Sequence, residues 1–225
     1  MKIVTRVIQL FLGLFLFAVG IVMTINANFG LAPWDVFHQG ISAKTNITLG
    51  QVSIIAGIIL IIINSFLGER TGWGTLANML FVGLFLDFLM LNKFIPTFTH
   101  ELPRFLMLLA GMFIIGVGSY FYLRVGLGSG PRDGLMIALT KKTQKSVGFI
   151  RNVIESGVLI LGYLLGGYIG IGTLVVALTI GYFIQFAFKI FHFNVSEVKH
   201  RFIDEDIKWL LRRLVKSGKT KTDSP

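Results

Sequence analysis

The sequence contains no cysteine, and only 14% of its 225 residues are charged. Without cysteine there are no disulfides and no thiolate metal sites. A soluble domain carries about a quarter charged residues, so the shortage of charge excludes an ordinary soluble fold. Hydrophobic residues make up 54% of the chain, and the mean hydropathy is +0.76. Because several apolar runs reach the roughly 20 residues that cross a bilayer as a helix, the chain is predicted to be an integral membrane protein.

Acidic residues are also scarce: 11 stand against 21 lysines and arginines, which leaves a formal charge of +10. In a membrane protein, basic residues mainly report topology and contact with anionic lipid. The excess of positive charge therefore does not indicate a nucleic-acid partner. The expected partners are membrane lipids, above all those of the anionic inner leaflet, and a small-molecule solute.

One segment of the sequence occurs twice. Gly30-Leu31-Ala32-Pro33-Trp34-Asp35 returns 98 positions later as Gly128-Ser129-Gly130-Pro131-Arg132-Asp133, and the same offset holds without a gap between residues 6–92 and 104–190. Glycines recur at this offset, as in the pairs Gly13/Gly111, Gly20/Gly118 and Gly83/Gly181. Such a register indicates a duplicated unit. We therefore expect one repeat in residues 1–98, a second in 99–191, and a basic tail in 192–225.

Each unit contains three apolar runs that are read as membrane-spanning helices, because backbone groups in lipid must be satisfied within the segment. The runs of the first unit are Val7–Ala27, Leu49–Leu67 and Trp73–Leu91. Those of the second are Phe105–Val125, Val147–Leu165 and Gly170–Phe188. The predicted fold is an all-α membrane protein with six transmembrane helices.

Three spans are an odd number, so the second unit must enter the membrane in the opposite orientation to the first. Most of the 21 lysines and arginines fall on one side of this topology, whereas the other side holds Lys44, Lys93 and Arg104. The positive-inside rule then places both termini in the cytoplasm. The two units are predicted to form an inverted repeat.

The Pro-x-Asp segments lie between the first and second span of each unit. Pro33 and Pro131 suit the first position of a helix, and Asp35 and Asp133 are expected to cap the exposed N–H groups there. Short helices should run from these prolines to about Lys44 and Lys142. In one interpretation they are broken or re-entrant helices whose positive N-terminal ends face a cavity. In the other they are interfacial helices whose aspartates merely cap.

The tail contains a segment with helical spacing of apolar residues, Val195 to Val215, interleaved with charged residues. Such a pattern is typical of an amphipathic helix that lies on the inner leaflet or packs under the bundle. We therefore expect a cytoplasmic amphipathic helix after the second unit.

The second unit carries ionisable residues where the first has none. Arg124, Arg132, Arg151 and Glu155 replace Asn26, Trp34, Ser53 and Gly57. Ionisable residues within a membrane are functional candidates, and guanidinium groups match carboxylates and phosphates. These residues predict an anion site, together with Pro33, Trp34, Asp35, Pro131 and Asp133. Against this, Arg124 and Arg132 can simply obey the positive-inside rule, and Arg151 can serve only to pair with Glu155 four residues on.

Two further ionisable residues, both in the first unit, need an interpretation. Asp87 lies late in its span and is a candidate proton site, although its position also allows contact with water. His38 has no second histidine at ligand spacing and is read as interfacial rather than metal-binding. There is no Walker loop, metal cluster or nucleophile–base arrangement, so we expect no cofactor, no metal and no enzymatic activity.

The two Pro-x-Asp segments and the Gly-x-Gly-Thr motifs at 72–75 and 170–173 resemble those of the YczE/YyaS/YitT group of bacterial inner-membrane proteins. The resemblance covers about residues 6–190. It implies a polytopic protein of the bacterial plasma membrane and brings no established activity with it.

These observations favour a small inverted-repeat transporter or permease for a small solute, with arginine favouring an anionic one. The alternative is a non-transporting membrane scaffold or accessory protein that assists another membrane or biosynthetic system. A homodimer is compatible with either interpretation. A polar cavity between the two Pro-x-Asp segments, as opposed to packed apolar side chains, would favour the transporter.

Overall fold

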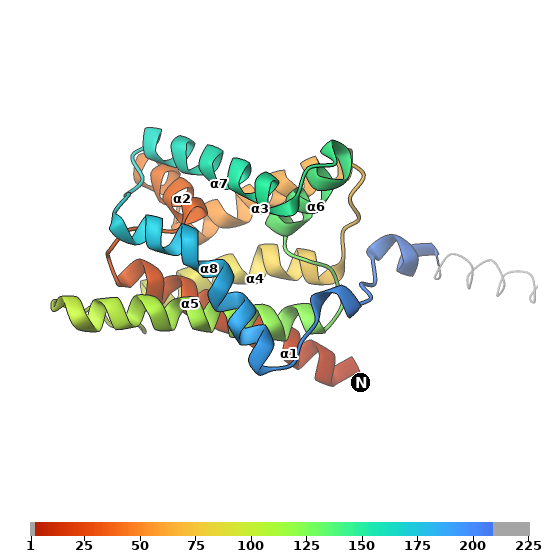
Figure 1. Cartoon of the computed structure of the whole chain (residues 1–225), viewed down its shortest axis with the longest axis horizontal. Coiled ribbons are helices and arrows are strands. Elements are labelled where there is room, and N and C mark those ends of the chain that lie inside the picture. Colours follow the sequence, from red (N-terminus) through yellow and green to blue (C-terminus); the bar gives the residue numbers. More distant parts are fainter. Residues whose placement is uncertain (1–2, 209–225) are drawn as a thin grey trace, which may run out of the picture.

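The computed structural model describes residues 3–208, and within this range the regular structure is entirely helical. Six helices are long and apolar enough to cross a membrane: α1 (Ile3–Asn26), α3 (Leu49–Phe66), α4 (Trp73–Leu91), α5 (Glu101–Arg124), α7 (Val147–Leu164) and α8 (Ile171–Ile190). The six predicted spans are confirmed, each to within a few residues. Figure 1 shows them running roughly side by side.

One shorter helix follows the first span of each half: α2 (Pro33–Lys44) in the first half and α6 (Pro131–Thr143) in the second. Each begins at its proline, as predicted, because the fixed φ of proline suits the first helical turn. The linkers before them turn at Gly30 and Gly128, whose φ angles of 128° and 106° favour glycine. In Figure 1, α2 and α6 lie at opposite ends of the bundle.

The helix boundaries repeat with the sequence. Every helix of residues 3–91 has a counterpart that begins 98 positions later, so that α1, α2, α3 and α4 correspond to α5, α6, α7 and α8. The sequence duplication is therefore also a duplication of secondary structure.

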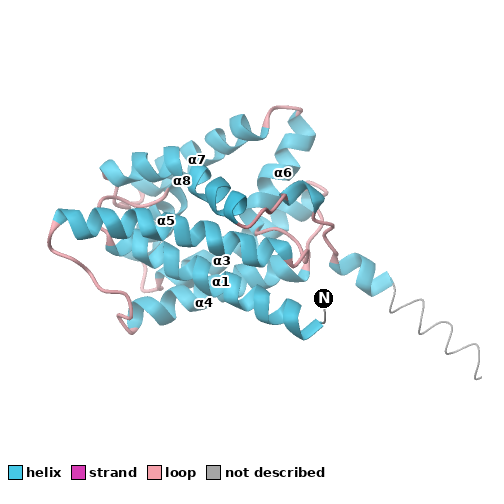
Figure 2. Cartoon of the chain, turned by 60° about the horizontal axis from the view of Figure 1, so that its bottom comes forward, coloured by secondary structure: helices cyan, strands magenta, loops and turns pink. Residues whose placement is uncertain are grey.

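The centre of the bundle is the antiparallel pair α1 and α5 (Figure 2). Gly13 packs on Gly118, and Gly20 packs on Gly111, with backbone so close that a Cβ at Gly20 would lie 2.6 Å from the carbonyl oxygen of Gly111. Small residues at these positions let the two membrane helices approach each other closely. Each contact joins an early residue of one helix to a later residue of the other, as antiparallel helices require.

The two halves are interlaced. The Gly74 N–H, in the first turn of α4, donates to the Leu127 carbonyl at 2.6 Å, and the Gly172 N–H, in the first turn of α8, donates to the Phe29 carbonyl at 2.7 Å. Each bond joins a helix start in one half to the linker of the other half. Similarly, α2 packs on α7, and α6 packs on α3. Neither half forms a separate bundle.

The packing of the halves differs at one place. In the first half, α3 packs on α4 at Gly50, where a Cβ would overlap the carbonyl oxygen of Gly83. The counterparts in α7 and α8 are Gly148 and Gly181, and apart from the adjoining backbone of its own helix, nothing in the described chain lies within 4 Å of a Cβ built at either position. Gly83 and Gly181 thus occupy equivalent positions in the sequence, but of these two glycines only Gly83 is closely packed in the described chain.

The segment after α8 differs from the predicted helix over Val195–Val215. Residues Val195–Glu197 form a 3-10 helix, residues 198–202 have no regular secondary structure, and residues 203–208 are helical, while 209–215 lie outside the described residues. The prediction is wrong for 195–202 because the backbone there bonds to loops of the bundle. The Arg201 N–H donates to the Gly126 carbonyl at 2.8 Å, and the Ile203 N–H donates to the Thr71 carbonyl at 3.1 Å. We call residues 198–208 the strap.

Candidate functional site

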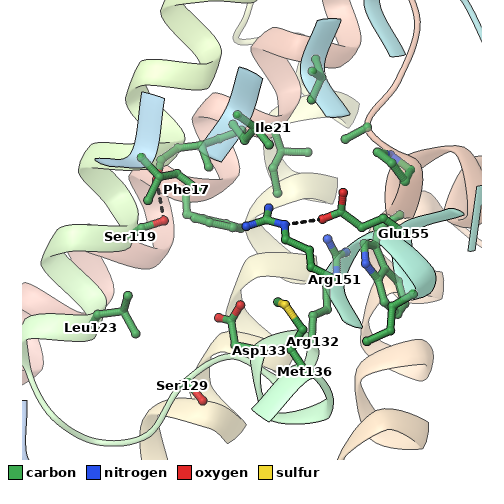
Figure 3. Close-up of a pocket in the computed structure, with 18 of the residues that line it drawn as sticks. Phe17, Ile21, Ser119, Leu123, Ser129, Arg132, Asp133, Met136, Arg151 and Glu155 are labelled. Carbon is green, nitrogen blue, oxygen red and sulfur yellow. Dashed lines mark hydrogen bonds and ion pairs between the residues drawn. The ribbon is translucent and has the colours of Figure 1, made fainter. Parts of the chain in front are cut away.

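A cavity of about 390 Å³ lies between the two halves (Figure 3). Its wall combines apolar residues of α1, α5 and α8 with the first turns of α2 and α6 and one face of α7. Small-molecule sites occupy about 300–1,000 Å³ and are mostly apolar with a few polar groups. The volume therefore suits a small solute.

Most of the predicted site residues line this cavity: Pro33, Trp34, Asp35, Arg132, Asp133, Arg151 and Glu155. The first turns of α2 and α6 therefore face one common space, although the two helices lie toward opposite ends of the bundle. Pro131 lines a second cavity, described below. Arg124 lies outside both cavities, at the exposed end of α5, where its guanidinium donates to the Tyr120 hydroxyl at 2.5 Å.

The ion pair between Arg151 and Glu155 forms as predicted. The two side chains, one helical turn apart on α7, approach to 2.8 Å, and Figure 3 shows this bond beside Arg132 and Asp133. Each group satisfies the other, so the pair adds polarity to the wall with little net charge.

Arg132 is differently placed. Its guanidinium carbon lies 4.8 Å from the centroid of the Trp34 ring, a cation–π contact. Among the described residues it has no hydrogen bond and no ion pair. A guanidinium carries five N–H donors in a planar fork, and here these donors remain available to a ligand.

The two aspartates have different partners. Asp133 accepts a hydrogen bond from the Tyr122 hydroxyl at 3.1 Å. Asp35 is 3% exposed, and its Oδ1 has no hydrogen-bond partner in the described chain. The prediction that Asp35 and Asp133 cap their helices is wrong, because no side-chain hydrogen bond caps the start of α2 or α6. Buried carboxylates are usually paired, so Asp35 is an exception that calls for a chemical explanation.

A second cavity of about 90 Å³ lies on the other side of the Pro-x-Asp segments. It is lined by counterparts of residues that line the larger cavity. Ser53, Gly57 and Asn78 occupy the positions that Arg151, Glu155 and Val176 occupy in the larger one. Arg132, Asp133 and Tyr122 line both. Equivalent positions in the two halves thus enclose a large space in one half and a small space in the other.

His38 lies in the wall of the smaller cavity and is 1% exposed. The prediction that it is interfacial is therefore wrong. The packing of α2 against α7 and α3 buries it, and sequence periodicity does not reveal a contact between such distant segments. One sequence signal was available, since His38 follows Asp35 by three positions and shares its helix face.

Asp87 lines neither cavity. Its carboxylate accepts hydrogen bonds from the Thr48 hydroxyl at 2.5 Å and from the Gly50 N–H at 2.9 Å. Both donors stand at the start of α3, where N–H groups lack helical partners. Asp87 thus fastens the start of α3 to α4, and this geometry favours a structural role for it.

The strap reaches the larger cavity, which the sequence did not predict. The His200 ring lines it, and its Nδ1 accepts a hydrogen bond from the Gly128 N–H at 3.2 Å. Burial lowers the pKa of the His200 imidazole below its ordinary value of 6.5. On the outer side of the strap, Asp204 forms an ion pair with Arg70 at 2.6 Å, and this pairing lowers the pKa of the Asp204 carboxyl. The described residues contain no group of three or more side chains suited to a metal ion.

Comparisons with known proteins agree with the membrane architecture. A family described as a family of unknown function, DUF6198, matches residues 4–189. The uncharacterized membrane protein YczE of Bacillus subtilis (strain 168) is 35% identical over 79% of this chain and 82% of its own length. An uncharacterized protein of Haemophilus influenzae is 34% identical, covering 80% of this chain and 82% of the relative. YyaS of Bacillus subtilis is 27% identical over 72% of this chain and 82% of its own length. No solved structure matches the chain.

Proposed function

The chain belongs to the DUF6198 family of multi-pass membrane proteins of unknown function, and we propose that it is a small secondary transporter of the bacterial plasma membrane. Its solute is small and anionic and occupies the cavity between the Pro-x-Asp segments. Four observations support this function: the relation between the halves, the distribution of charge, the unequal cavities and the free guanidinium of Arg132.

The two halves form an inverted repeat, related by a two-fold axis in the membrane plane. Supporting contacts come in reciprocal pairs, because Gly13–Gly118 and Gly20–Gly111 exchange under the 98-residue offset. The hydrogen bonds from Gly74 to Leu127 and from Gly172 to Phe29 exchange in the same way. Since α1 and α5 are antiparallel, an axis that exchanges them is perpendicular to both. Inverted repeats with a site near the midplane are a common transporter architecture.

The end of the bundle that carries the N-terminus and the strap faces the cytoplasm. The loops that follow α3 and α6 lie near this end in Figure 1, and exposed Arg70, Lys141, Lys142 and Lys145 belong to these loops or to the last turn of α6. The end of α2 and the connector from α4 to α5, which carry exposed Lys44 and Lys93, lie near the other end. Basic residues concentrate on the cytoplasmic side of membrane proteins. In this orientation the strap lies against the inner leaflet.

The unequal cavities are the observation that carries the transport function. Equivalent positions enclose about 390 Å³ beside α7 and α8 and about 90 Å³ beside α3 and α4. Where α3 closes on α4 at Gly50 and Gly83, the matching glycines of α7 and α8 remain apart. If α7 closed on α8 while α3 separated from α4, the large space would pass to the opposite side of the pseudo-two-fold axis. Such an exchange is alternating access.

Selectivity for an anion rests on Arg132. Its donors face the cavity without a hydrogen-bond partner among the described residues, and the stacked Trp34 ring holds the guanidinium in place. The remaining wall is largely apolar, so the preferred solute combines one anionic group with an apolar body. The alternative, a non-transporting scaffold, requires neither a ligand nor a change in the two cavities.

Ligand-induced stabilisation of the purified protein tests this function. Three probes of matched aromatic body differ in charge: benzenesulfonate, phenyltrimethylammonium and benzamide. We expect benzenesulfonate to raise the melting temperature in proportion to the logarithm of its concentration and the other two to have little effect. Arg132→Ala should remove the shift, and Arg124→Ala, which alters an exposed arginine outside the cavity, should retain it.

Uptake into proteoliposomes completes the test. Labelled benzenesulfonate should accumulate faster in vesicles that contain the protein than in vesicles that contain Arg132→Ala. If no probe stabilises the protein and none is taken up, or if Arg132→Ala behaves like the wild type, the anion transporter is refuted and the scaffold becomes the better account.

A further inference from the structure

Two buried ionisable side chains of α2 face each other without hydrogen-bond partners. The His38 Nδ1 lies 3.9 Å from the Asp35 Oδ1, and the two side chains are 1% and 4% exposed. Three buried atoms of this pair have no hydrogen-bond partner within the described chain: Asp35 Oδ1, His38 Nδ1 and His38 Nε2. Buried polar atoms without partners are rare in native proteins, and those that persist commonly have a chemical role.

The pair stands between the two cavities. Asp35 lines the larger one and His38 lines the smaller one, although the residues are only one helical turn apart. A group bound at Asp35 can therefore be reached from one cavity, and a group bound at His38 from the other. This position suits a small species that passes between the two spaces.

The charged groups around the pair come from several elements. From α6, Arg132 and Asp133 line both cavities. From α7, the Arg151–Glu155 pair lines the larger cavity, and α5 contributes the Tyr122 hydroxyl. The helix α3, which also packs on α2, carries no charged residue. On α2 itself, the other charged residue is Lys44, exposed at the far end.

We propose that Asp35 and His38 form a proton-binding site. One proton satisfies two of these atoms, Asp35 Oδ1 and His38 Nδ1, because a protonated Asp35 carboxyl can donate to His38 Nδ1 once a small side-chain rotation closes the 3.9 Å gap. The bonding balances simply: an O–H bond forms at Asp35, its hydrogen is shared with Nδ1, and no other group changes. When His38 holds the proton instead, Asp35 accepts from it. The proton can therefore be passed between the two cavities.

The site also explains how a proton and an anion are taken up together, an extension that rests on the proposed transport function. Three carboxylates, Asp35, Asp133 and Glu155, share the larger cavity with two guanidiniums, Arg132 and Arg151. With all of them ionised, an anion would add to an excess of negative charge. A proton on Asp35 removes that excess, so the free Arg132 binds an anion more tightly when the proton is present. The transporter is then a proton–anion symporter.

The indole of Trp34 offers a direct test of the proton site in the absence of any solute. Its ring centroid lies 6.3 Å from that of His38, and the other two tryptophans, Trp73 and Trp209, can be replaced by phenylalanine. In this single-tryptophan protein we expect the Trp34 fluorescence to show a titration between about pH 5 and 8, the range in which histidines change charge. Asp35→Asn and His38→Gln should each abolish the transition.

Two controls make the titration decisive. His200→Gln removes the histidine that lines the larger cavity and should leave the transition in place. Should Asp35→Asn or His38→Gln fail to fold, the unsubstituted protein with 13C-labelled aspartate still provides a measurement, since a protonated aspartate gives an infrared carboxyl band that appears as pH falls. Absence of both the fluorescence transition and the infrared band, or their survival in the Asp35 and His38 variants, would refute the proton site.

Coupling is measured with benzenesulfonate, which stays anionic over this range. Its stabilisation of the protein should increase several-fold in effective affinity from pH 8 to pH 6, and in Asp35→Asn the affinity should be high and independent of pH. A fluorescence titration without benzenesulfonate binding would retain the proton site and refute the anion transporter. Benzenesulfonate binding without a titration would retain the transporter and refute the proton site.

Discussion

The guanidinium of Arg132 stacks on the indole of Trp34, with 4.8 Å between its carbon and the ring centroid, and these two residues occupy the same position in the two repeats. Residues that correspond under a two-fold relation can touch only close to the axis. In the proposed inverted repeat, the contact therefore lies close to the pseudo-two-fold axis. At this position the two repeats differ: one contributes a cation and the other an aromatic ring. The two sides of the cavity therefore differ chemically at this contact.

This stacking predicts the effect of substitutions at Trp34. Cation–π contacts contribute about 0.5–2 kcal/mol, so Trp34→Leu should lower the free energy of unfolding by about 1 kcal/mol beyond the effect of lost apolar area. Trp34→Phe should keep part of that contribution. Thermal unfolding in detergent measures both, and equal stabilities of the Leu and Phe variants would contradict the contribution of the ring face.

Substitutions at the glycines of α4 and α8 should affect stability and transport separately. Gly83→Ala should destabilise the protein by about 1–3 kcal/mol, since its Cβ would lie 2.5 Å from Ile54. Gly181→Ala should leave the melting temperature unchanged, because space surrounds that position in the described chain. If α7 closes on α8 during transport, Gly181→Leu should nevertheless reduce uptake strongly.

A matched control for that experiment is Gly157→Leu. This glycine also has open space around it, but its counterpart in the first repeat is Ile59, so no close packing is expected there in either state. Uptake that survives Gly181→Leu, or that falls equally in both variants, would show that α7 and α8 do not close through Gly181.

The inverted arrangement predicts the sides on which two exposed lysines lie. Lys44 and Lys142 end the equivalent helices α2 and α6, and both are exposed. Because the chain has no native cysteine, single Lys44→Cys and Lys142→Cys variants give clean labelling. An impermeant maleimide should label Lys44→Cys in intact cells and Lys142→Cys only after permeabilisation. Labelling of both from one side would rule out an inverted repeat.

Asp87 should prove structural. Asp87→Ala removes the acceptor for the Thr48 hydroxyl and the Gly50 N–H, and hydrogen bonds to charged groups contribute about 1.5–3 kcal/mol. We expect a lower melting temperature of that variant and an unchanged pH transition of Trp34. A normal melting temperature with an altered pH transition would return Asp87 to its place as a candidate proton site.

Docking of the strap should depend on pH through His200. Burial lowers the pKa of this imidazole, so the unfolded or undocked strap binds its proton more readily than the docked strap. The docking free energy is therefore fully present above about pH 6.5 and decreases as pH falls below it, since a proton on Nδ1 also removes the acceptor for the Gly128 N–H. Relative to the exchange rate of an unprotected amide at the same pH, hydrogen exchange of the Arg201 and Ile203 amides should become faster at acid pH. His200→Gln should remove this dependence on pH.

Much of the architecture could be predicted from the sequence because it rests on local patterns. Apolar runs located the six spans, and the prolines located the starts of α2 and α6. The recurrence of Asp35 and Asp133 at one offset pointed to the segments that line the cavity. In each case the signal lies in residue type and spacing, which a single sequence contains.

The errors concern contacts between distant segments. The burial of His38 depends on packing of α2 against α7, and the irregular course of residues 198–202 depends on carbonyls of Gly126 and Thr71. Neither leaves a periodic trace in the sequence. Arg124 was grouped with Arg132 and Arg151 by residue type, yet its place at the end of α5 carries it outside the cavity. Likewise, the repeat gave no reason to expect that Gly148 and Gly181 would stand apart while Gly50 and Gly83 are packed.

The interlaced halves have a consequence for biosynthesis. The N-terminal half is inserted first, yet Asn64 of α3 donates to the Pro131 carbonyl, and Gly40 of α2 packs on Gly162, both of which are translated much later. Until α6 and α7 emerge from the ribosome, α2 and α3 lack these partners, and the Asn64 amide has no Pro131 carbonyl to bond. The nascent first half should therefore remain loosely assembled and open to membrane chaperones and quality-control proteases. A frameshift or stop codon near residue 100 would yield a fragment that is degraded instead of a half-sized protein that accumulates.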